Sequence, residues 1–408
     1  MLPSPSFDLE AQEDAVSSSM TTHRRRMLPW VAAAVVTTVG LGACTNAGAN
    51  GVNDGPPQSR AVIAVQSAKD RAFSPTKPIV VKAEQGQLTQ VSVSDERGRK
   101  IAGSYSNHRM AWTSNEGPLP FNTRYSVTAR AEDSDGVPAR ESTWLKTVKP
   151  KSTGYSSIVP AGEAVVGVGM PIIMTFDQPV RRKPAVEERL SVTTKPATVG
   201  SWYWVNDQMV RWRPKHYWKP GTDVTVRSRL EGINFGNGVW GDDDDMARFS
   251  VGAATISTVD IANHMMTVTQ DGDLLRKVPI TTGKSGWDTR VGTKVIISKD
   301  RVVTMDAASI DVSPSDPEYY RLRVEYAMRL TWSGEYIHAA PWSESDQGQA
   351  NVSHGCTGMS MADAQWFYDL SKVGDVVNYV NGTRQPEAWN GYTDWNMSWA
   401  DWQKGSAL

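Results

Sequence analysis

Cysteine is almost absent from this sequence: 2 occur among 408 residues, at Cys44 and Cys356. An excess of charge of either sign is missing too, because 43 Lys and Arg stand against 44 Asp and Glu, for a formal net charge of −1. This balance gives the chain no bulk electrostatic reason to bind nucleic acid, and we expect no nucleic-acid partner. A chain of this length is expected to form several domains.

The one long apolar run lies near the N-terminus, at residues 27–44, directly after the basic stretch His23-Arg24-Arg25-Arg26. A basic patch before a short apolar run is typical of a secretory signal. The run is short for a membrane-spanning helix, which needs about 20 apolar residues. In either case we expect the rest of the chain to lie outside the cytoplasmic membrane.

The end of that run, Leu41-Gly42-Ala43-Cys44, resembles the lipobox of bacterial lipoproteins. The resemblance implies a lipoprotein signal at residues 1–43, which is removed, and a lipid-modified Cys44 that attaches the protein to the outer face of the cytoplasmic membrane, facing the cell wall. An uncleaved anchor or a plain signal is the alternative. If Cys44 carries lipid, Cys356 has no disulfide partner, so its thiol is reactive, intermolecular or a buried structural group.

Four segments follow the signal. Residues 44–60 are rich in Gly, Asn and Pro and are predicted to be a flexible tether. Residues 61–149 and 150–251 each contain short alternating runs divided by turn residues, which is typical of a β-sandwich. Trp112 and Trp212 occupy equivalent positions ahead of a second alternating run, so we predict tandem immunoglobulin-like domains that act as a spacer. The acid run at residues 242–245 lacks the spaced ligands of a calcium loop, and we expect a solvated turn and no metal.

Residues 252–380 are predicted to form a second kind of β-rich domain. Gln270-Asp271-Gly272 is a hairpin signal. The one convincing helix begins at Ser360-Met361-Ala362-Asp363, a capping-box-like start, and Gly374 is suited to close it. In residues 381–408, Trp395, Trp399 and Trp402 are spaced for one face of a short helix, which we expect to pack on the preceding domain, with a glycan-binding platform as the alternative. The predicted fold class is therefore mainly β.

The chemistry is concentrated around Cys356. His354 lies two residues before it and His338 eighteen before it, and an imidazole can take the proton that makes a cysteine nucleophilic. Gly355 allows a sharp backbone turn beside the sulfur, and the N-terminus of the helix after Ser360 is expected to point towards it. We do not expect Cys356, His354 and His338 to bind zinc, because a zinc site usually has three or four protein ligands at wider spacing. We also reject a serine nucleophile elbow, because the final glycine of that motif is missing here. A serine β-lactam-binding enzyme is rejected too, because the fragments that resemble its motifs fall in different domains.

His338, fourteen intervening residues and then Ser353-His354-Gly355-Cys356 resemble the signature of L,D-transpeptidases with a YkuD-type catalytic domain. The resemblance extends over most of the chain, to actinobacterial members with two immunoglobulin-like domains. It implies that the cysteine attacks the third residue of a peptidoglycan tetrapeptide stem, releases D-Ala and passes the acyl group to another stem as a 3→3 cross-link. It implies no cofactor, peptidoglycan stem peptides as substrates, and carbapenems as acylating inhibitors.

The resemblance also implies roles for individual residues. Cys356 would be the nucleophile and His338 the base, oriented by the backbone carbonyl of Ala339, while the amides of Gly355 and Cys356 would form the oxyanion hole with help from the Tyr320 hydroxyl. The substrate cleft would be lined by Met305, Tyr320, Trp342, Ser353, His354 and Gly358.

Three positions depart from the family pattern: Gly358 replaces the Asn of the motif, Ile310 replaces a lid Tyr, and Arg290 replaces a Pro. The Gly358 exchange removes side-chain hydrogen bonds that would fix the nucleophile loop. An L,D-carboxypeptidase, a transferase that anchors proteins to the wall, and a degenerate wall-binding scaffold therefore stay open as alternatives.

Overall fold

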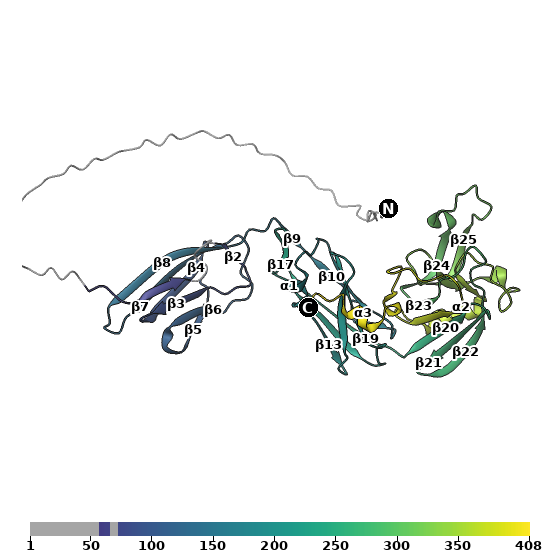
Figure 1. Ribbon diagram of the computed structural model, residues 1–408, viewed down its shortest axis with the longest axis horizontal. Coiled ribbons are helices and arrows are strands. Elements are labelled where there is room, and N and C mark those ends of the chain that lie inside the picture. The colour runs from purple at the N-terminus through teal and green to yellow at the C-terminus, as the bar shows by residue number, and fades with distance from the viewer. Residues whose placement is uncertain (1–56, 66–71) are drawn as a thin grey trace, which may run out of the picture. The chain divides into compact units, whose positions relative to one another are not determined.

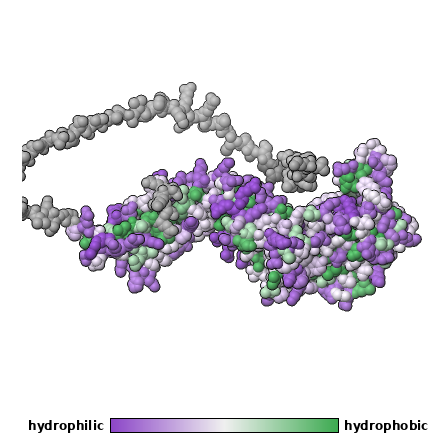
Figure 2. All heavy atoms as spheres, in the orientation of Figure 1, coloured by the Kyte–Doolittle hydropathy of each residue, from purple (hydrophilic) through white to green (hydrophobic). Residues whose placement is uncertain are grey.

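The computed structural model describes residues 57–65 and 72–408 (Figure 1). The predicted signal, Cys44 and most of the predicted tether lie outside these residues. The described chain is built mainly from strands, as predicted, arranged in seven sheets with three short α-helices. No described helix is long and apolar enough to cross a membrane. The visible face of the described residues is mostly hydrophilic, with apolar residues scattered over it (Figure 2).

The first sandwich occupies the region after the tether. One sheet has the order β1 (Val62–Val65), β3 (Val80–Glu84), β6 (Ala111–Ser114) and β5 (Gly103–Tyr105), and the short 3-10 helix η1 (Asn107–Arg109) precedes β6. The other has the order β2 (Ala72–Phe73), β8 (Pro138–Thr147), β7 (Arg124–Glu132) and β4 (Gln87–Asp95). Buried and more exposed residues alternate along β7, which is the pattern of a half-buried strand. The buried residues of the strands of this sandwich together form one apolar core.

The second sandwich has the same plan. One sheet has the order β10 (Ser156–Val159), β12 (Ile172–Phe176), β15 (Met209–Pro214) and β14 (Gly200–Trp204). The other has the order β11 (Ala164–Val166), β19 (Asp244–Val251), β16 (Asp223–Arg229) and β13 (Leu190–Lys195). A small sheet of β17 (Asn234–Gly236), β18 (Val239–Gly241) and β9 (Ser152–Gly154), and the helix α1 (Lys183–Glu187), complete it.

The predicted repeat rests on a shared contact between a tryptophan and a glycine. Trp112 on β6 and Trp212 on β15 are both buried, and each ring lies against a glycine of the neighbouring strand. A Cβ on Gly103 would stand 2.1 Å from the Trp112 ring, and one on Gly200 would stand 1.9 Å from the Trp212 ring. Only glycine leaves room for the indole in both sandwiches, which confirms the predicted equivalence of the two tryptophans.

The third region contains two sheets and one main helix. The five-stranded sheet has the order β22 (Asp273–Pro279), β21 (Met265–Gln270), β20 (Thr255–Asp260), β28 (Val376–Val380) and β23 (Gly292–Val295). The four-stranded sheet has the order β24 (Ser298–Asp306), β25 (Arg321–Arg329), β26 (Tyr336–Ala339) and β27 (Thr357–Met359). The short 3-10 helices η2 (Ala307–Ile310) and η3 (Pro341–Ser343) follow β24 and β26. The apolar core of this region includes residues of both sheets and of α2 (Met361–Leu370).

Two local predictions in this region are confirmed. The β21–β22 hairpin turns at Asp271 and Gly272, which both have positive φ, as a two-residue hairpin turn requires. Ser360 caps α2, since its hydroxyl accepts a hydrogen bond from the Asp363 amide. The three-residue strand β27 separates this helix from Cys356, so the α2 N-terminus does not directly follow the nucleophile.

The tryptophan-rich tail differs from the prediction in two ways. It forms the 3-10 turn η4 (Asp394–Asn396) and the helix α3 (Trp399–Gln403), separated by an extended Met397, instead of one continuous helix. Its indole groups also bond to the second sandwich: Trp395 donates to the Gly169 carbonyl at 2.8 Å and Trp402 to the Ser201 carbonyl at 2.9 Å. The tail therefore contacts the second sandwich as well as the catalytic domain on which it was predicted to pack.

The physical reason is the Arg213 side chain of β15. Its guanidinium lies over the rings of Trp395, Trp399 and Trp402, at 4.8, 5.3 and 4.8 Å from their centroids. An arginine among three indoles offers them both apolar contact and cation–π attraction. The tail remains attached to that sheet through Asn396, which accepts from the Thr293 amide at 2.8 Å.

Candidate active site

Cys356 lies at a cavity of about 270 Å³ in the third region. The cavity is bordered by strands β24, β25 and β26 and by the loop that carries the cysteine. Eight residues predicted from the sequence line it: Met305, Tyr320, His338, Trp342, Ser353, His354, Cys356 and Gly358. Residues separated by up to about fifty positions along the chain are thus brought to one place.

His338 lies on β26, and a backbone carbonyl fixes which of its ring nitrogens carries the proton. It is 5% exposed, and its Nδ1 lies 2.8 Å from the Ala339 carbonyl oxygen. A carbonyl only accepts hydrogen bonds, so Nδ1 carries the proton and Nε2 has a free lone pair. Burial lowers the pKa of His338, opposed by the bond to Ala339. The imidazole is therefore neutral at physiological pH and able to accept a proton.

Cys356 is a free thiol, 9% exposed. It follows Gly355, whose φ of 119° lies in the region that favours glycine, as the predicted sharp turn requires. Its Sγ is 3.6 Å from the Gly334 carbonyl oxygen, a neutral acceptor. Burial raises the pKa of Cys356 to about 12, only partly offset by the Tyr336 amide. The resting sulfur is therefore protonated, and attack requires transfer of its proton to a base.

Ser353 fixes the loop that carries the nucleophile. Its hydroxyl donates to the Cys356 carbonyl at 2.6 Å and accepts from the Gly355 amide at 3.0 Å. The Gly355 amide, predicted to be an oxyanion donor, is bonded to the Ser353 hydroxyl in this structure, so that role stays a prediction. The Cys356 amide is the one of the two predicted donors that this contact leaves available.

Two aromatic residues shape the cavity around these groups. Burial raises the pKa of Tyr320 to about 12, so its hydroxyl stays protonated and can donate a hydrogen bond. Trp342 is 55% exposed, and its ring is stacked near that of His338, with centroids 6.0 Å apart. An exposed indole beside a buried base provides an apolar wall for a peptide substrate.

A buried thiol, a neutral histidine oriented by a carbonyl and a phenol donor at one cavity are the parts of a cysteine acyltransferase. Comparison with family models matches residues 254–378 to the L,D-transpeptidase catalytic domain YkuD and residues 70–234 to a bacterial Ig domain. L,D-transpeptidase 2 of Mycobacterium tuberculosis is 34% identical over 391 residues, which cover 93% of this chain and 95% of that protein. The chain belongs to the L,D-transpeptidase family.

Other relatives match a shorter part of the chain. L,D-transpeptidase 1 of Mycobacterium tuberculosis is 39% identical over 229 residues, which cover 56% of this chain and 85% of that protein. A solved structure of the L,D-transpeptidase LdtMt1 in complex with imipenem is 39% identical and covers 55% of this chain and 97% of that one, with a TM-score of 0.49.

Gly358 of this transpeptidase occupies a position without room for a side chain. A Cβ there would stand 2.9 Å from the Ala340 Cβ and 3.1 Å from the Thr281 Cγ2. The backbone at this position is held by two hydrogen bonds: Gly358 N donates to the Thr281 oxygen, and Thr281 N donates to the Gly358 oxygen, both at 2.9 Å. The glycine that replaces the family's asparagine therefore fits its surroundings, which leave no room for a larger side chain.

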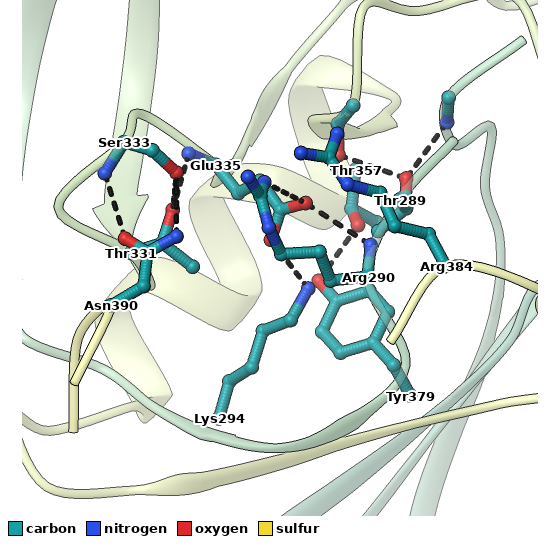
Figure 3. A network of polar contacts seen from close by, with 12 residues as sticks. Thr289, Arg290, Lys294, Thr331, Ser333, Glu335, Thr357, Tyr379, Arg384 and Asn390 are labelled. Atoms are coloured by element: carbon teal, nitrogen blue, oxygen red, sulfur yellow. Dashed lines mark hydrogen bonds and ion pairs between the residues drawn. The ribbon is translucent and has the colours of Figure 1, made fainter. Parts of the chain in front are cut away.

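The sequence analysis did not find the buried ionic cluster of Arg290, Lys294 and Glu335 (Figure 3). Glu335 lies between Lys294, at 2.6 Å, and Arg290, at 3.1 Å, and all three are less than a tenth exposed. Arg290 also pairs with Glu387 at 2.8 Å, so this second departure from the family pattern is accommodated by two carboxylates. A Cβ on Gly355 would stand 3.9 Å from the Glu335 side chain, so the cluster lies against the nucleophile loop.

Two further hydrogen bonds anchor the same loop on either side of the nucleophile. Thr289 donates its hydroxyl to the Gly355 carbonyl at 2.9 Å, and the hydroxyls of Thr357 and Tyr379 are 2.8 Å apart (Figure 3). The Tyr379 ring in turn lies 3.7 Å beneath the Lys294 ammonium. The backbone of Gly355 and the side chain of Thr357 are both tied to buried groups.

His354 contacts a carboxylate that the sequence did not reveal. Its Nε2 is 2.7 Å from Glu318 Oε2, and the same oxygen accepts from the Lys284 ammonium at 2.6 Å. The rings of Trp287 and Tyr320 pack against the imidazole, with centroids 4.8 and 4.9 Å away. His354 thus lines the cavity, as predicted, and in addition contacts a charged partner, Glu318. No cluster of described residues has the make-up of a metal site.

Proposed function

We propose that this enzyme forms 3→3 cross-links in peptidoglycan through a thioester at Cys356. The observation that carries the proposal is that the neutral His338, held by Ala339, and the protonated thiol of Cys356 line the same cavity. His338 takes the thiol proton as Sγ attacks the carbonyl of the third stem residue, and the Cys356 amide and Tyr320 hydroxyl stabilise the oxyanion. The proton then passes to the departing D-Ala nitrogen, leaving the thioester.

The second half-reaction transfers the acyl group. The side-chain amine of another stem attacks the thioester, the C–S bond breaks and an amide forms. Water in place of the amine would make the enzyme an L,D-carboxypeptidase, because the same thioester serves both reactions. The strained amide of a carbapenem offers the same thiolate an electrophile, so we expect it to acylate Cys356.

The test uses the chain that begins after Cys44, incubated with a disaccharide-tetrapeptide stem and examined by mass spectrometry. A dimer formed with loss of D-Ala supports transpeptidation, and trimming to the tripeptide alone would replace the proposal with a carboxypeptidase. Cys356→Ala should abolish both products while leaving the thermal unfolding temperature unchanged. A dimer formed by that variant would refute the mechanism, and an unreactive Cys356 in the wild type would favour a wall-binding scaffold.

We also propose that the enzyme is anchored by lipid on Cys44 at the outer face of the cytoplasmic membrane. The sequence of residues 41–44 and the position of stem peptides in the wall support this. Cys44→Ser should release the full-length protein from the membrane fraction into the medium. Retention of that variant in the membrane fraction would contradict lipid anchoring and favour an uncleaved apolar anchor.

A further inference from the structure

Two histidines line the cavity, and their partners differ in charge. The Nδ1 of His338 bonds to the neutral carbonyl of Ala339, whereas the Nε2 of His354 bonds to the carboxylate of Glu318 at 2.7 Å. A carboxylate accepts, so His354 carries its proton on Nε2 when neutral, and Nδ1 keeps a lone pair. Within the described part of the chain, Nδ1 of His354 has no hydrogen-bond partner.

The proposed reaction creates a need for a second base. An alkyl amine such as a stem side chain has a pKa near that of lysine, about 10.4, so it enters the site as an ammonium. It must lose one proton before it can attack the thioester and a second after it has attacked. His338 is neutral after acylation and can take one of these protons, the one that finally reaches the departing sulfur.

We propose that His354 is the base that removes the first proton from the acceptor ammonium, and that Glu318 positions it for this task. This inference rests on the proposed transpeptidase function. It explains why a carboxylate is placed against the imidazole that lies two residues from the nucleophile, when His338 alone is sufficient for acylation.

The protons and bonds of this step balance. Nδ1 of His354 takes a proton from the ammonium, and the resulting imidazolium is held by the Glu318 carboxylate. The free amine attacks the thioester carbonyl and forms the new C–N bond. Its remaining extra proton passes through His338 to the Cys356 sulfur as the C–S bond breaks. His354 then returns its proton to solvent.

The surroundings of His354 favour this exchange. Glu318 is its only charged hydrogen-bond partner among the described residues, and Lys284 reaches it through the shared carboxylate oxygen at 2.6 Å. The Lys284 ammonium, followed by His354, holds the pKa of Glu318 below its usual range, so the carboxylate stays ionised. The other neighbours, Trp287 and Tyr320, are uncharged and restrict the rotation of the ring.

The test compares two acceptors that differ in charge. The enzyme is acylated with the tetrapeptide stem, and transfer is then measured to a primary alkyl amine, which is an ammonium at neutral pH, and to hydroxylamine, which is largely uncharged there. Glu318→Gln keeps a hydrogen-bond partner of the same size but removes the charge. Glu325→Gln is the matched control, because Glu325 forms an exposed ion pair with Arg301 on the neighbouring strands.

We expect Glu318→Gln to lower the ratio of alkyl-amine transfer to hydroxylamine transfer about tenfold, and His354→Gln to lower it by about 100-fold, the scale of a lost general base. The alkyl-amine rate of both variants should recover as pH rises towards the pKa of the amine. Glu325→Gln should leave the ratio at the wild-type value. An equal loss with both acceptors, or no loss in either variant, would overturn the proposal.

The two proposals fail in different ways. A wild type that releases D-Ala but gives no amide with either acceptor refutes transpeptidation. A wild type that transfers to both acceptors, with variants whose ratio and pH profile are unchanged, refutes only the role of His354.

Discussion

Replacing Lys294 by methionine should destabilise the catalytic region, although the two side chains have similar volumes. Lys294 is 1% exposed, and its ammonium lies 2.6 Å from Glu335 and 3.7 Å above the Tyr379 ring. Burial lowers the pKa of Lys294, which shows that desolvation opposes its charge, and Glu335 compensates for this. Methionine removes the charge and leaves the Glu335 carboxylate buried.

The size of the effect follows from what remains around Glu335. Breaking a buried ion pair by removing one partner costs about 3–5 kcal/mol, because the other charge is left uncompensated. Arg290 still bonds to one Glu335 oxygen at 3.1 Å, so we expect the lower end, about 3 kcal/mol. The double variant Lys294→Met with Glu335→Gln removes the stranded charge and should recover a large part of this loss.

Chemical unfolding followed by tryptophan fluorescence measures these free energies of unfolding. Lys404→Met is the control, since Lys404 is 75% exposed and forms a surface ion pair with Asp401, and such pairs contribute about 0–1 kcal/mol. Because Glu335 lies against Gly355, carbapenem acylation of Cys356 should also slow in Lys294→Met. A Lys294→Met protein that unfolds at the wild-type denaturant concentration would refute this account of the cluster.

Three other changes test packing and titration. Gly358→Ala should cost about 1–3 kcal/mol through its contact with Ala340, and adding Ala340→Gly should restore the thermal midpoint; a Gly358→Ala protein as stable as wild type would contradict the packing argument. Burial raises the pKa of Asp375 from 3.8 to about 7. Between pH 3.8 and about 7 the folded state therefore holds a proton on Asp375 that the unfolded state releases, and the free energy of unfolding should fall as pH rises through this window. Asp375→Asn should remove that slope in melts at several pH values, and an unchanged slope would assign it to other groups. Trp402→Ala should cost about 3–5 kcal/mol, far more than truncation of the 43% exposed Trp332, and equal losses would show that the tail does not depend on this indole.

The features that the sequence predicted are local or carried by a short motif. The hairpin at Asp271-Gly272 and the cap at Ser360 follow from the conformational preferences of two or three adjacent residues. His338 and Cys356 were found because a base and a nucleophile of these types occur at a recognisable spacing. Such signals survive folding because few other arrangements satisfy them.

The missed features depend on contacts between distant charged residues. Glu318 meets His354 across 36 positions, and Lys294 meets Glu335 across 41. A single charged residue in a sequence gives no sign of whether it will be solvated or buried against a partner, because that is decided by the packing of strands. The packing of the tail was misjudged for the same reason, since Arg213 lies in another domain and its partners are known only once β15 is placed.

The different partners of the two histidines offer a physical basis for dividing the work of the reaction. A carbonyl fixes the orientation of His338 without adding charge, and burial keeps the ring neutral, which suits a base that must receive the proton of a thiol and return it within one half-reaction. A carboxylate beside His354 stabilises an imidazolium, which suits a group that removes a proton from an arriving ammonium and releases it later. The resting thiol is protonated and buried, so it needs a base before it can attack a donor. One histidine can thus serve acylation, and the other can activate the acceptor in the later step. The ratio of aminolysis to hydrolysis should then depend on the Glu318–His354 pair more than on the Cys356–His338 pair.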